Sequence, residues 1–586
     1  MKIRDRKRGA AVSTRVQKGS RLVAYFCAEY GINDATPIYS GGLGVLAGDI
    51  VQEAAEQKLP VAAIGLFYRK GYFHQHVDTK GQHEFTTTID PVASGLELIR
   101  DKDGETVLIE VPIAERIVYV QIWRWKLGST VNLYLLDTDH WKNSAEDRAI
   151  TDQLYSGDQA KRIEQEIVLG IGGFRALRFM KYKPEVYHMN EGHSAFLSLE
   201  LVSSLMRDQD IPSEHARKIA KGCLRFTNHT LVAAGNDAFS HTLVRSYLTL
   251  FAAESGLTMS EIINWGNAPE QPNSFSMTML ALRMAGVSTA VSRLHAEKAL
   301  SLWPHHPLVP ITNGVFLPGW IAPELQKLYA EFAPEWRPNA ADPKVWRGVR
   351  RMPHERLWEV HMTLKRRMLA EVELRTGMQM DERALTIVWA RRFATYKRPD
   401  LLFSDLNRLK KFIFRSDRPI QIIVAGKAHP ADTQGKEIIQ KIEDLALTEL
   451  QGKVVFLEDY SISLSRLLVS GADIWLNTPV FGLEASGTSG MKASANGVVQ
   501  VTVSDGWAHE VDWYGMGYEL PAEGAEKAIY SILERKAIPT FFRRNHDDVP
   551  ELWVAMMLET IASVSPAYSS ARMVHDYTRE LYDTQG

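Results

Sequence analysis

The sequence predicts an α/β protein made of two doubly wound domains that face each other across a cleft. Three observations support this prediction. Short apolar runs alternate with helical patterns along most of the 586 residues, polar motifs follow the apolar runs, and Gly and Pro punctuate a segment near the middle. Alternating strands and helices are typical of parallel sheets covered by helices. The length exceeds what one hydrophobic core usually organises, which favours at least two domains.

The N-terminal domain, predicted over residues 22–315, begins with a βαβ unit that has a glycine-rich first turn. The run "LVAYFCAEYG" predicts a strand, "VLAGDIVQEAAEQKL" a helix, and "PVAAIGLFY" a second strand. Further along, "EVYHMN" is predicted as a strand before the helix "HSAFLSLELVSSLM". "CLRFTNH" is predicted as another short strand that ends in polar residues.

The C-terminal domain, predicted over residues 316–555, repeats this pattern. The boundary is placed at the Gly- and Pro-containing segment "ITNGVFLPGWIAPEL". Helices are expected from about Gly435 and over "ISLSRLLVSG". The charged and aromatic residues 556–586 predict a helix that packs back on the N-terminal domain. Five apolar runs predict the strands of this domain: "ALTIVWA", "PIQIIVAG", "KVVFLEDY", "ADIWLNT" and "VVQVTVS".

Composition argues against several functional classes. The formal net charge of −2 gives no support for a nucleic-acid or membrane-surface partner. No apolar run approaches the roughly 20 residues that span a bilayer. The two cysteines, Cys27 and Cys223, indicate a reducing compartment, and we expect a cytoplasmic protein. Residues 1–21 are basic and lack an apolar core, so we expect a disordered arm, with a transit peptide as the alternative.

Standard nucleotide and metal motifs do not account for the polar residues. "SGGLG" has the wrong glycine spacing for a dinucleotide site, and no Walker A pattern occurs. His188 and His193 lie five residues apart, whereas the helical zinc motif places its histidines four apart. We therefore expect no metal. No strand-end pair of carboxylates stands out as the acid and nucleophile of a glycoside hydrolase.

Polar motifs from both domains instead follow predicted strands, which is where ligands bind in open α/β sheets. "RRFATYKRP" places Arg391, Arg392 and Lys397 directly after a strand, although a solvated face is the usual fate of such a cluster. Arginine and lysine at a strand end suit phosphate. Gly41 and Gly42 open a predicted helix, where backbone N–H groups can approach an anion; a plain tight turn is the alternative.

Lys492 follows the Ser- and Gly-rich stretch "EASGTSG". Such a stretch is compatible with a simple loop that enters a helix. A lysine can also form a Schiff base, and pyridoxal phosphate is the common cofactor that uses one.

At these motifs the sequence resembles the α-glucan phosphorylases. "EASGTSGMKASANG" is similar to the family's pyridoxal-phosphate attachment signature. "YSGGLGVLAGD", "HMNEGHSAF", "TNHTLVAAGNDAF" and "RRFATYKRPDLLF" also resemble that family, in the same order, between Leu22 and about Gly515, and point to its shorter, mostly prokaryotic branch. The resemblance implies a two-domain GT-B fold. It also implies phosphate-dependent cleavage of the terminal α-1,4-linked glucose of a glucan, which releases α-glucose 1-phosphate with retained configuration.

The resemblance assigns roles to particular residues. The implied catalytic residues are Lys492, Arg392, Lys397 and His229. Pyridoxal phosphate would be held by Lys492 as a Schiff base and surrounded by Thr488, Ser489, Gly490, Gly41, Gly42, Arg391 and Tyr460. The implied substrate-binding residues are Glu484, Ser486, Gly487, Tyr396, His193, Glu191 and Thr289. In this family the cofactor phosphate abuts inorganic phosphate, and their repulsion requires nearby cations and N–H groups.

Three departures from the family pattern leave the sugar open. Thr289 stands where family members commonly have Asn, Ala495 where they usually have Leu or Met, and Ser461 where the long members have Arg. One alternative is therefore a GT-B phosphorylase that acts on a different α-glucoside. Others are a nucleotide-sugar glycosyltransferase without pyridoxal phosphate and a glucan-binding protein that has lost catalysis. The expected partners are an α-glucan or maltodextrin and inorganic phosphate, with a homodimer by analogy and no allosteric control.

Overall fold

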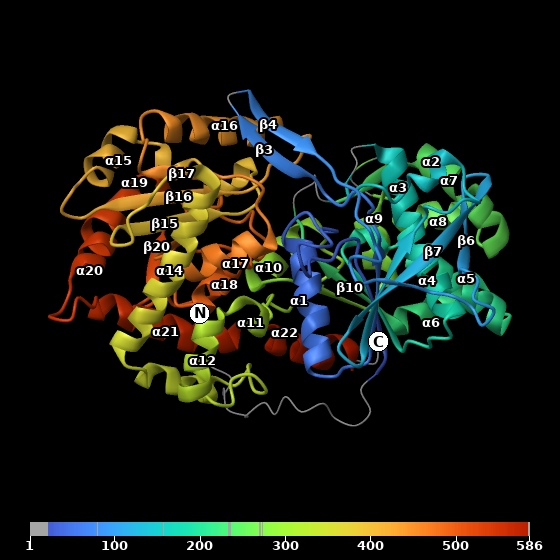
Figure 1. Cartoon of the computed structure of the whole chain (residues 1–586). Coiled ribbons are helices and arrows are strands. Elements are labelled where there is room, and N and C mark those ends of the chain that lie inside the picture. Colours follow the sequence, from blue (N-terminus) through green and yellow to red (C-terminus); the bar gives the residue numbers. More distant parts are fainter. Residues whose placement is uncertain are drawn as a thin grey trace.

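The computed structural model describes residues 21–78, 80–155, 158–231, 236–268, 271 and 273–583. The predicted basic arm therefore lies outside the described residues except for Arg21. Figure 1 shows two halves side by side, each built around its own sheet. The N-terminal half carries a ten-stranded sheet and the C-terminal half a six-stranded sheet. The predicted α/β class with parallel sheets is confirmed.

The strands predicted for the N-terminal half form the parallel centre of its sheet. The order β14-β13-β10-β9-β1-β2-β8 is parallel throughout. The bounds of these strands are β1 Val23–Phe26, β2 Val61–Leu66, β8 Val131–Asp137, β9 Val186–Asn190, β10 Leu224–Asn228, β13 Val287–Ala290 and β14 Val309–Pro310.

An antiparallel edge completes this sheet and was not predicted. β7 pairs with β8, β6 and β5 in antiparallel fashion. In β7, buried residues are interspersed with partly exposed ones, so the continuous apolar run of a buried parallel strand is missing. The bounds are β5 Glu97–Leu98, β6 Leu108–Ile113 and β7 Arg116–Leu127.

The first helix, α1 (Gly42–Glu56), lies at the boundary between the halves. It packs unusually close to the loop after β1, because a Cβ atom at Gly48 would lie 2.1 Å from the carbonyl oxygen of Gly31. Only glycine permits this approach. The close contact fixes the start of α1 beside the carboxyl end of β1, where the predicted site begins.

The C-terminal sheet is entirely parallel, in the order β17-β16-β15-β18-β19-β20. All five predicted strands are present, and β20 extends the edge. The strand bounds are β15 Leu385–Ala390, β16 Ile420–Ala425, β17 Val454–Leu457, β18 Ile474–Asn477, β19 Val499–Val503 and β20 Gly517–Leu520. Its helices include α14 His354–Thr376, α16 Thr433–Leu447, α17 Ile462–Gly471 and α18 Ser489–Ala495.

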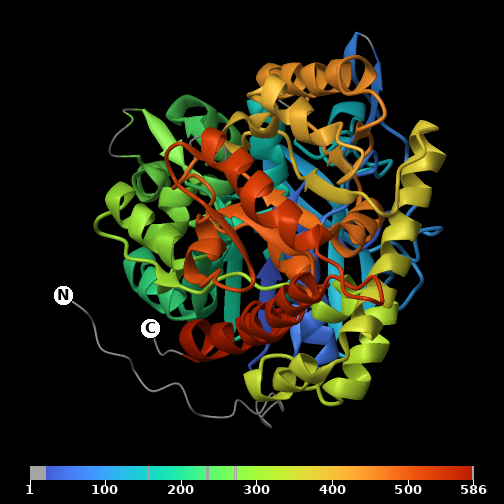
Figure 2. The same cartoon turned by 90° about the vertical axis from the view of Figure 1, so that its left-hand side faces the viewer.

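The C-terminal segment joins the two halves. Helix α21 (Glu551–Ala567) packs on the C-terminal half, and α22 (Ser570–Tyr577) then packs against α1. The hydroxyl of Ser570 donates a hydrogen bond to Glu53 on α1 at 2.5 Å. In Figure 2 these red helices run along the lower side of the molecule. Residue 556, where the sequence placed the start of this segment, lies inside α21.

A separate two-stranded hairpin also spans the halves. We call β3 (His74–Asp78) and β4 (Gly81–Phe85) the β3–β4 hairpin, and Figure 1 shows it leaving the N-terminal half to lie on the other. The Gln75 amide donates to the carbonyl of Gly426 at 3.1 Å. His74 Nδ1 lies 3.0 Å from a carboxylate oxygen of Asp459. The hairpin thus covers the ends of β16 and β17.

A buried charge network stabilises the C-terminal half. Lys365 Nζ lies 2.5 Å from Asp473, whose other oxygen lies 2.8 Å from His361 Nε2, and all three side chains are nearly inaccessible. We expect Lys365→Met to lower the free energy of unfolding by about 3–5 kcal/mol, because Asp473 would lose its cation while remaining buried. Urea denaturation measures this change, and the exposed Lys411→Met serves as control. Equal stability of the two variants would contradict the prediction.

Candidate active site

A cluster of charged residues lies beyond the carboxyl end of β15. Arg391 follows that strand directly, and Lys397 lies in a short 3₁₀ turn, Thr395–Lys397. Both reach Glu484: Arg391 Nη2 lies 2.8 Å and Lys397 Nζ 2.9 Å from one carboxylate oxygen. Burial alone would raise the pKa of Glu484, but Arg391 and Lys397 outweigh it and lower that pKa to about 2. Glu484 is therefore ionised at any neutral pH.

Arg392 is the cation of this cluster that is left available. It is exposed and makes no hydrogen bond or ion pair with the residues that the structure describes. The protein that surrounds part of this side chain lowers its pKa, but Tyr396 and Tyr72, in their ionised form, outweigh that effect and raise the pKa of Arg392. Tyr72 belongs to the N-terminal half, so the cluster faces both halves. Three cations and one carboxylate leave a formal charge of +2, which suits a dianion.

Lys492 lies in α18 and presents a buried amine. Its Nζ lies 3.8 Å from the ring centre of Trp320, and it has no hydrogen-bond partner among the described side chains and backbone groups. Burial lowers the pKa of Lys492 to about 8, while Asp49 opposes that shift. Only an unprotonated amine can attack a carbonyl carbon, and the lowered pKa leaves part of Lys492 in that form at neutral pH.

The turn before α18 is tightly constrained. Gly487 has φ +78°, a conformation that favours glycine. A Cβ atom at Gly490 would lie 2.9 Å from the ring of Trp507. Thr488 is the residue that precedes the helix, and Ser489 accepts a hydrogen bond from Trp475 Nε1 at 3.3 Å. These contacts constrain the backbone that leads from Glu484 into α18.

One hydroxyl of this turn remains free to bind a ligand. The Oγ atom of Ser486 is buried and has no partner within the described part of the chain. A buried hydroxyl normally finds a hydrogen-bond partner, so an orphan here indicates a group that a ligand can satisfy.

Gly41 and Gly42 form the N-terminal start of α1. No side chain caps this helix, and a Cβ atom at either glycine would meet no atom within 4 Å. Open space at an uncapped helix N-terminus favours an anion. Glu29 was missed from the sequence: its carboxylate accepts the N–H of Ser40 at 2.6 Å and of Gly41 at 3.4 Å. It also accepts the Tyr155 hydroxyl at 2.8 Å.

The N-terminal half contributes polar residues at the ends of β9 and β10. His229 Nε2 lies 2.6 Å from Asn190 Oδ1, and the His229 backbone N–H donates to Glu191 at 2.6 Å. Burial lowers the pKa of His229 to about 3, so the ring is neutral. Burial also raises the pKa of Glu191 to about 8. His193 Nε2 lies 3.2 Å from Asp237.

Two of the predicted residues, Tyr396 and Tyr460, lie near cations of the charged cluster, and Thr289 does not. Lys397 Nζ lies 4.9 Å from the ring centre of Tyr396. Tyr460 donates to Ser465 at 2.9 Å. Thr289 is fully buried and shares a 2.7 Å hydrogen bond with Thr227, so the structure does not bring its side chain to the charged cluster.

The other two departures from the family pattern are also located away from the charged cluster. Ala495 is buried in the hydrophobic core, where its carbonyl accepts the Tyr329 hydroxyl at 2.8 Å. Ser461 caps α17 by accepting the N–H of Leu464. Both residues have structural partners of their own.

Asp49 and Trp320 are further residues that sequence reasoning missed. Asp49 is a buried carboxylate in the apolar stretch "VLAGDIV", and that contrast was a signal that could have found it. Trp320 lies in the segment between the two sheets and carries no local signal. The indole N–H of Trp320 donates to Asp49 at 2.8 Å.

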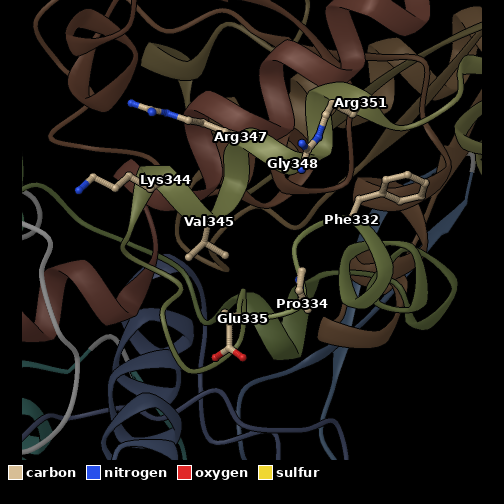
Figure 3. Close-up of a pocket in the computed structure, with 8 residues that line it drawn as sticks. All are labelled: Phe332, Pro334, Glu335, Lys344, Val345, Arg347, Gly348 and Arg351. Atoms are coloured by element: carbon tan, nitrogen blue, oxygen red, sulfur yellow. The ribbon is translucent and has the colours of Figure 1, made fainter.

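Other candidate sites are weaker. Figure 3 shows a surface pocket of about 520 Å³ that contains no predicted site residue. Two of its three cations, Lys344 and Arg347, extend away from the third, Arg351, so the three do not converge on one centre. In the described ranges no three His, Cys, Asp or Glu residues are grouped as metal ligands. No described helix combines the length and apolar character needed to cross a membrane.

The low pKa of Glu484 predicts a specific acid sensitivity. Its ion pairs stabilise the fold fully above the unfolded pKa of about 4.5, and this stabilisation is lost as the pH falls toward 2. We expect Glu484→Gln to lack this pH-dependent part, about 3 kcal/mol. Urea unfolding at a series of pH values measures it, with the exposed Glu523→Gln as control. Parallel pH curves for Glu484→Gln and the unaltered chain would contradict this assignment.

Comparisons with known proteins identify a family model and several relatives that this chain resembles. Residues 267–513 match the family model described as carbohydrate phosphorylase. The chain is 40% identical to the maltodextrin phosphorylase of Thermococcus litoralis, over 97% of this chain and 71% of the relative. It is 36% identical to a glycogen phosphorylase of Mycobacterium tuberculosis, over 96% and 70%. It is 35% identical to the glycogen phosphorylase of Aquifex aeolicus, over 96% and 86%.

Proposed function

The chain belongs to the carbohydrate phosphorylase family, and from this premise we propose that it cleaves the terminal α-1,4-linked glucose of an α-glucan or maltodextrin with inorganic phosphate. It is then an enzyme of the glycosyltransferase type that releases α-glucose 1-phosphate. One observation carries the proposal: a charged cluster of net +2, in which Arg392 is exposed, is linked through Glu484 and the turn before α18 to a buried lysine, and that lysine has no hydrogen bond among the described residues. Binding of a phosphate dianion would neutralise that cluster.

The residues around Lys492 fit pyridoxal phosphate. The amine is buried and without a hydrogen bond among the residues described, as a carbonyl-binding lysine requires. When bound, the cofactor would supply a phosphate group that exchanges a proton with the substrate phosphate. Arg391, Thr488, Ser489, Gly490, Gly41 and Gly42 are proposed to hold that phosphate, and Tyr460 to lie against the ring. The open space at Gly41 and Gly42 is consistent with this arrangement.

The chain's own residues would act mainly by charge and position. We assign Arg392 and Lys397 to the substrate phosphate, because a phosphate charge placed at the glycosidic bond has to be neutralised. Glu484, Ser486, Gly487 and Tyr396 would contact the reacting sugar, and Glu191 and His193 the next one. The neutral ring of His229 can hydrogen-bond a sugar hydroxyl without adding charge. Phosphate held on the face from which the glucan leaves would give retention of configuration.

The relative placement of the two halves fits the GT-B architecture, which we propose for this chain. Residues 22–315 and 316–555 would be the two domains, and residues 556–586 the segment that returns to the first domain. Contacts between the halves occur close to the site: Ser292 donates to the carbonyl of Ala485 at 2.6 Å. A homodimer and a cytoplasmic location stay predictions.

A phosphorolysis assay tests the function. The purified chain is incubated with maltoheptaose and inorganic phosphate, and the product is identified by phosphorus and proton NMR. We expect α-glucose 1-phosphate, formed only when phosphate is present. Release of free glucose would overturn the proposal. Transfer from a nucleotide sugar without phosphate would instead support the glycosyltransferase alternative, and phosphorolysis of another α-glucoside alone would revise the substrate.

A further inference from the structure

We propose that Asp49 and Trp320 are positioning residues for Lys492: Trp320 supplies the surface on which the amine lies, and Asp49 supplies its counter-charge. This inference rests on the proposed function only in that Lys492 is the reactive lysine. Asp49 belongs to α1 in the N-terminal half, Trp320 to the short helix α11 (Leu317–Trp320) between the sheets, and Lys492 to α18. The site of the lysine is therefore completed by three separate parts of the chain.

Trp320 connects the other two residues physically. Its indole N–H donates to both carboxylate oxygens of Asp49, at 2.8 and 3.0 Å. The face of the same ring lies 3.8 Å from Lys492 Nζ. Asp49 is 2% and Trp320 4% exposed, so water does not screen these contacts effectively. The orientation of the ring and the place of the carboxylate are fixed together.

Asn496 fastens Trp320 to the helix that carries Lys492. The Asn496 side chain donates to the Trp320 carbonyl at 2.9 Å and accepts the N–H of Ala322 at 2.9 Å. It also donates to the carbonyl of Lys492 at 2.9 Å. The distance between the ring and the amine is thus held by the backbone on both sides.

The charges around Lys492 are few and can be named. Asp49 on α1 and Arg466 on α17 are the charged groups that act on it, and Trp320 is the ring against it. Arg466 also lies on the Trp320 ring, 5.6 Å from its centre, and donates to Gly319 at 3.1 Å. Glu53 is the next carboxylate along α1, and it accepts hydrogen bonds from Ser570 and Gln57.

Burial and the charge of Asp49 shift the pKa of Lys492 in opposite directions. Burial lowers the pKa of Lys492 to about 8, and Asp49 counters part of that effect. Burial raises the pKa of Asp49 to about 6, and Lys492 counters it in turn. At neutral pH the pair is mainly ionised, with an appreciable fraction of neutral amine. Asp49 therefore sets the fraction of Lys492 that can attack a carbonyl carbon.

A purely structural role for Asp49 makes a different prediction. If the carboxylate served only to satisfy the buried indole N–H, an amide oxygen would replace it without effect on Lys492. Asp49→Asn preserves the acceptor and removes the charge. Trp320→Phe preserves the ring face and removes the donor that holds the carboxylate. Glu53→Gln, which neutralises a buried carboxylate one turn away, is the matched control.

The amine is titrated in the full-length protein after hydroxylamine has removed any bound carbonyl compound. Reductive methylation with formaldehyde and cyanoborohydride is performed between pH 5 and 10, and labelling of Lys492 is followed by peptide mass spectrometry. We expect a midpoint near pH 8 for the unaltered chain. Asp49→Asn should lower it by about one pH unit, because an opposite charge close by shifts a pKa by that order. Trp320→Phe should lower it less, and Glu53→Gln should leave it unchanged.

An unchanged midpoint in Asp49→Asn would overturn the proposal. If Lys492 resists labelling in every variant, a double-mutant cycle decides instead. Asp49→Asn and Lys492→Met, measured by urea unfolding, should be coupled by at least about tenfold in the unfolding constant, as expected for contacting groups. Additive effects would also overturn it.

Added pyridoxal phosphate separates this inference from the proposed function. An adduct on Lys492, trapped with borohydride, whose formation shifts with pH in Asp49→Asn supports both. Absence of any adduct in the unaltered chain would remove the cofactor from the proposed function. The methylation midpoint would still test Asp49 in that case.

Discussion

Lys492→Arg should reduce phosphorolysis below detection and abolish a borohydride-reducible chromophore in the near ultraviolet. Arginine keeps the positive charge against Trp320, but its guanidinium stays protonated and cannot condense with a carbonyl. The loss would therefore report the chemistry of the amine and not its charge. Activity and the absorbance spectrum of the purified variant are measured together.

The exposed Lys536→Arg is the matched control and should retain both properties. Circular dichroism and urea unfolding show whether Lys492→Arg remains folded. A folded Lys492→Arg variant with full activity would contradict the role of Lys492. Lost activity with an unchanged chromophore would instead place the cofactor on another lysine.

Lys397→Ala should lower kcat/KM for inorganic phosphate by about 10²- to 10³-fold, the loss typical of one donor to a developing charge. The physical reason is local, since Lys397 and Arg391 share Glu484 and the cluster would fall from +2 to +1. The KM for maltodextrin should change much less. Initial rates are measured while each substrate is varied separately.

Lys410→Ala removes a lysine of helix α15 (Leu406–Ile413) that pairs with Glu449 at 2.5 Å, and it controls for loss of charge alone. Lys397→Arg should recover part of the lost activity because the charge returns, although its geometry differs. An equal effect of Lys397→Ala on both substrates would remove Lys397 from the phosphate site.

Much of the architecture could be predicted because buried parallel strands leave a strong signal. Runs such as "ALTIVWA" are apolar throughout, and the polar residues that follow them are confined to one edge of the sheet. The antiparallel edge of the first sheet and the β3–β4 hairpin escaped prediction. Their strands are partly exposed, and their positions depend on contacts with distant residues.

Some residues of the candidate site could likewise be predicted from the sequence, and others could not. Glu484, Lys397 and Arg391 come from two motifs 87 or more residues apart, and strand ends bring them together. Asp49 and Trp320 could not be paired from sequence, because 271 residues separate them and nothing local indicates their contact. Thr289 is the opposite case: the family resemblance assigned it to the substrate, and its side chain is hydrogen-bonded to Thr227 inside the sheet.

The β3–β4 hairpin has a mechanical consequence for the whole molecule. The chain passes between the halves at two places that lie near one another: residues 311–323, and Ser569, where it returns to the N-terminal half. Alone, these two connections would act as a hinge about which the halves could rotate. The hairpin is a third attachment, and Figure 1 places it on the opposite, upper side. Rotation of the halves about that hinge would therefore have to break the contacts of the hairpin with Gly426 and Asp459. Any movement of one half relative to the other would thus be coupled to release of the β3–β4 hairpin.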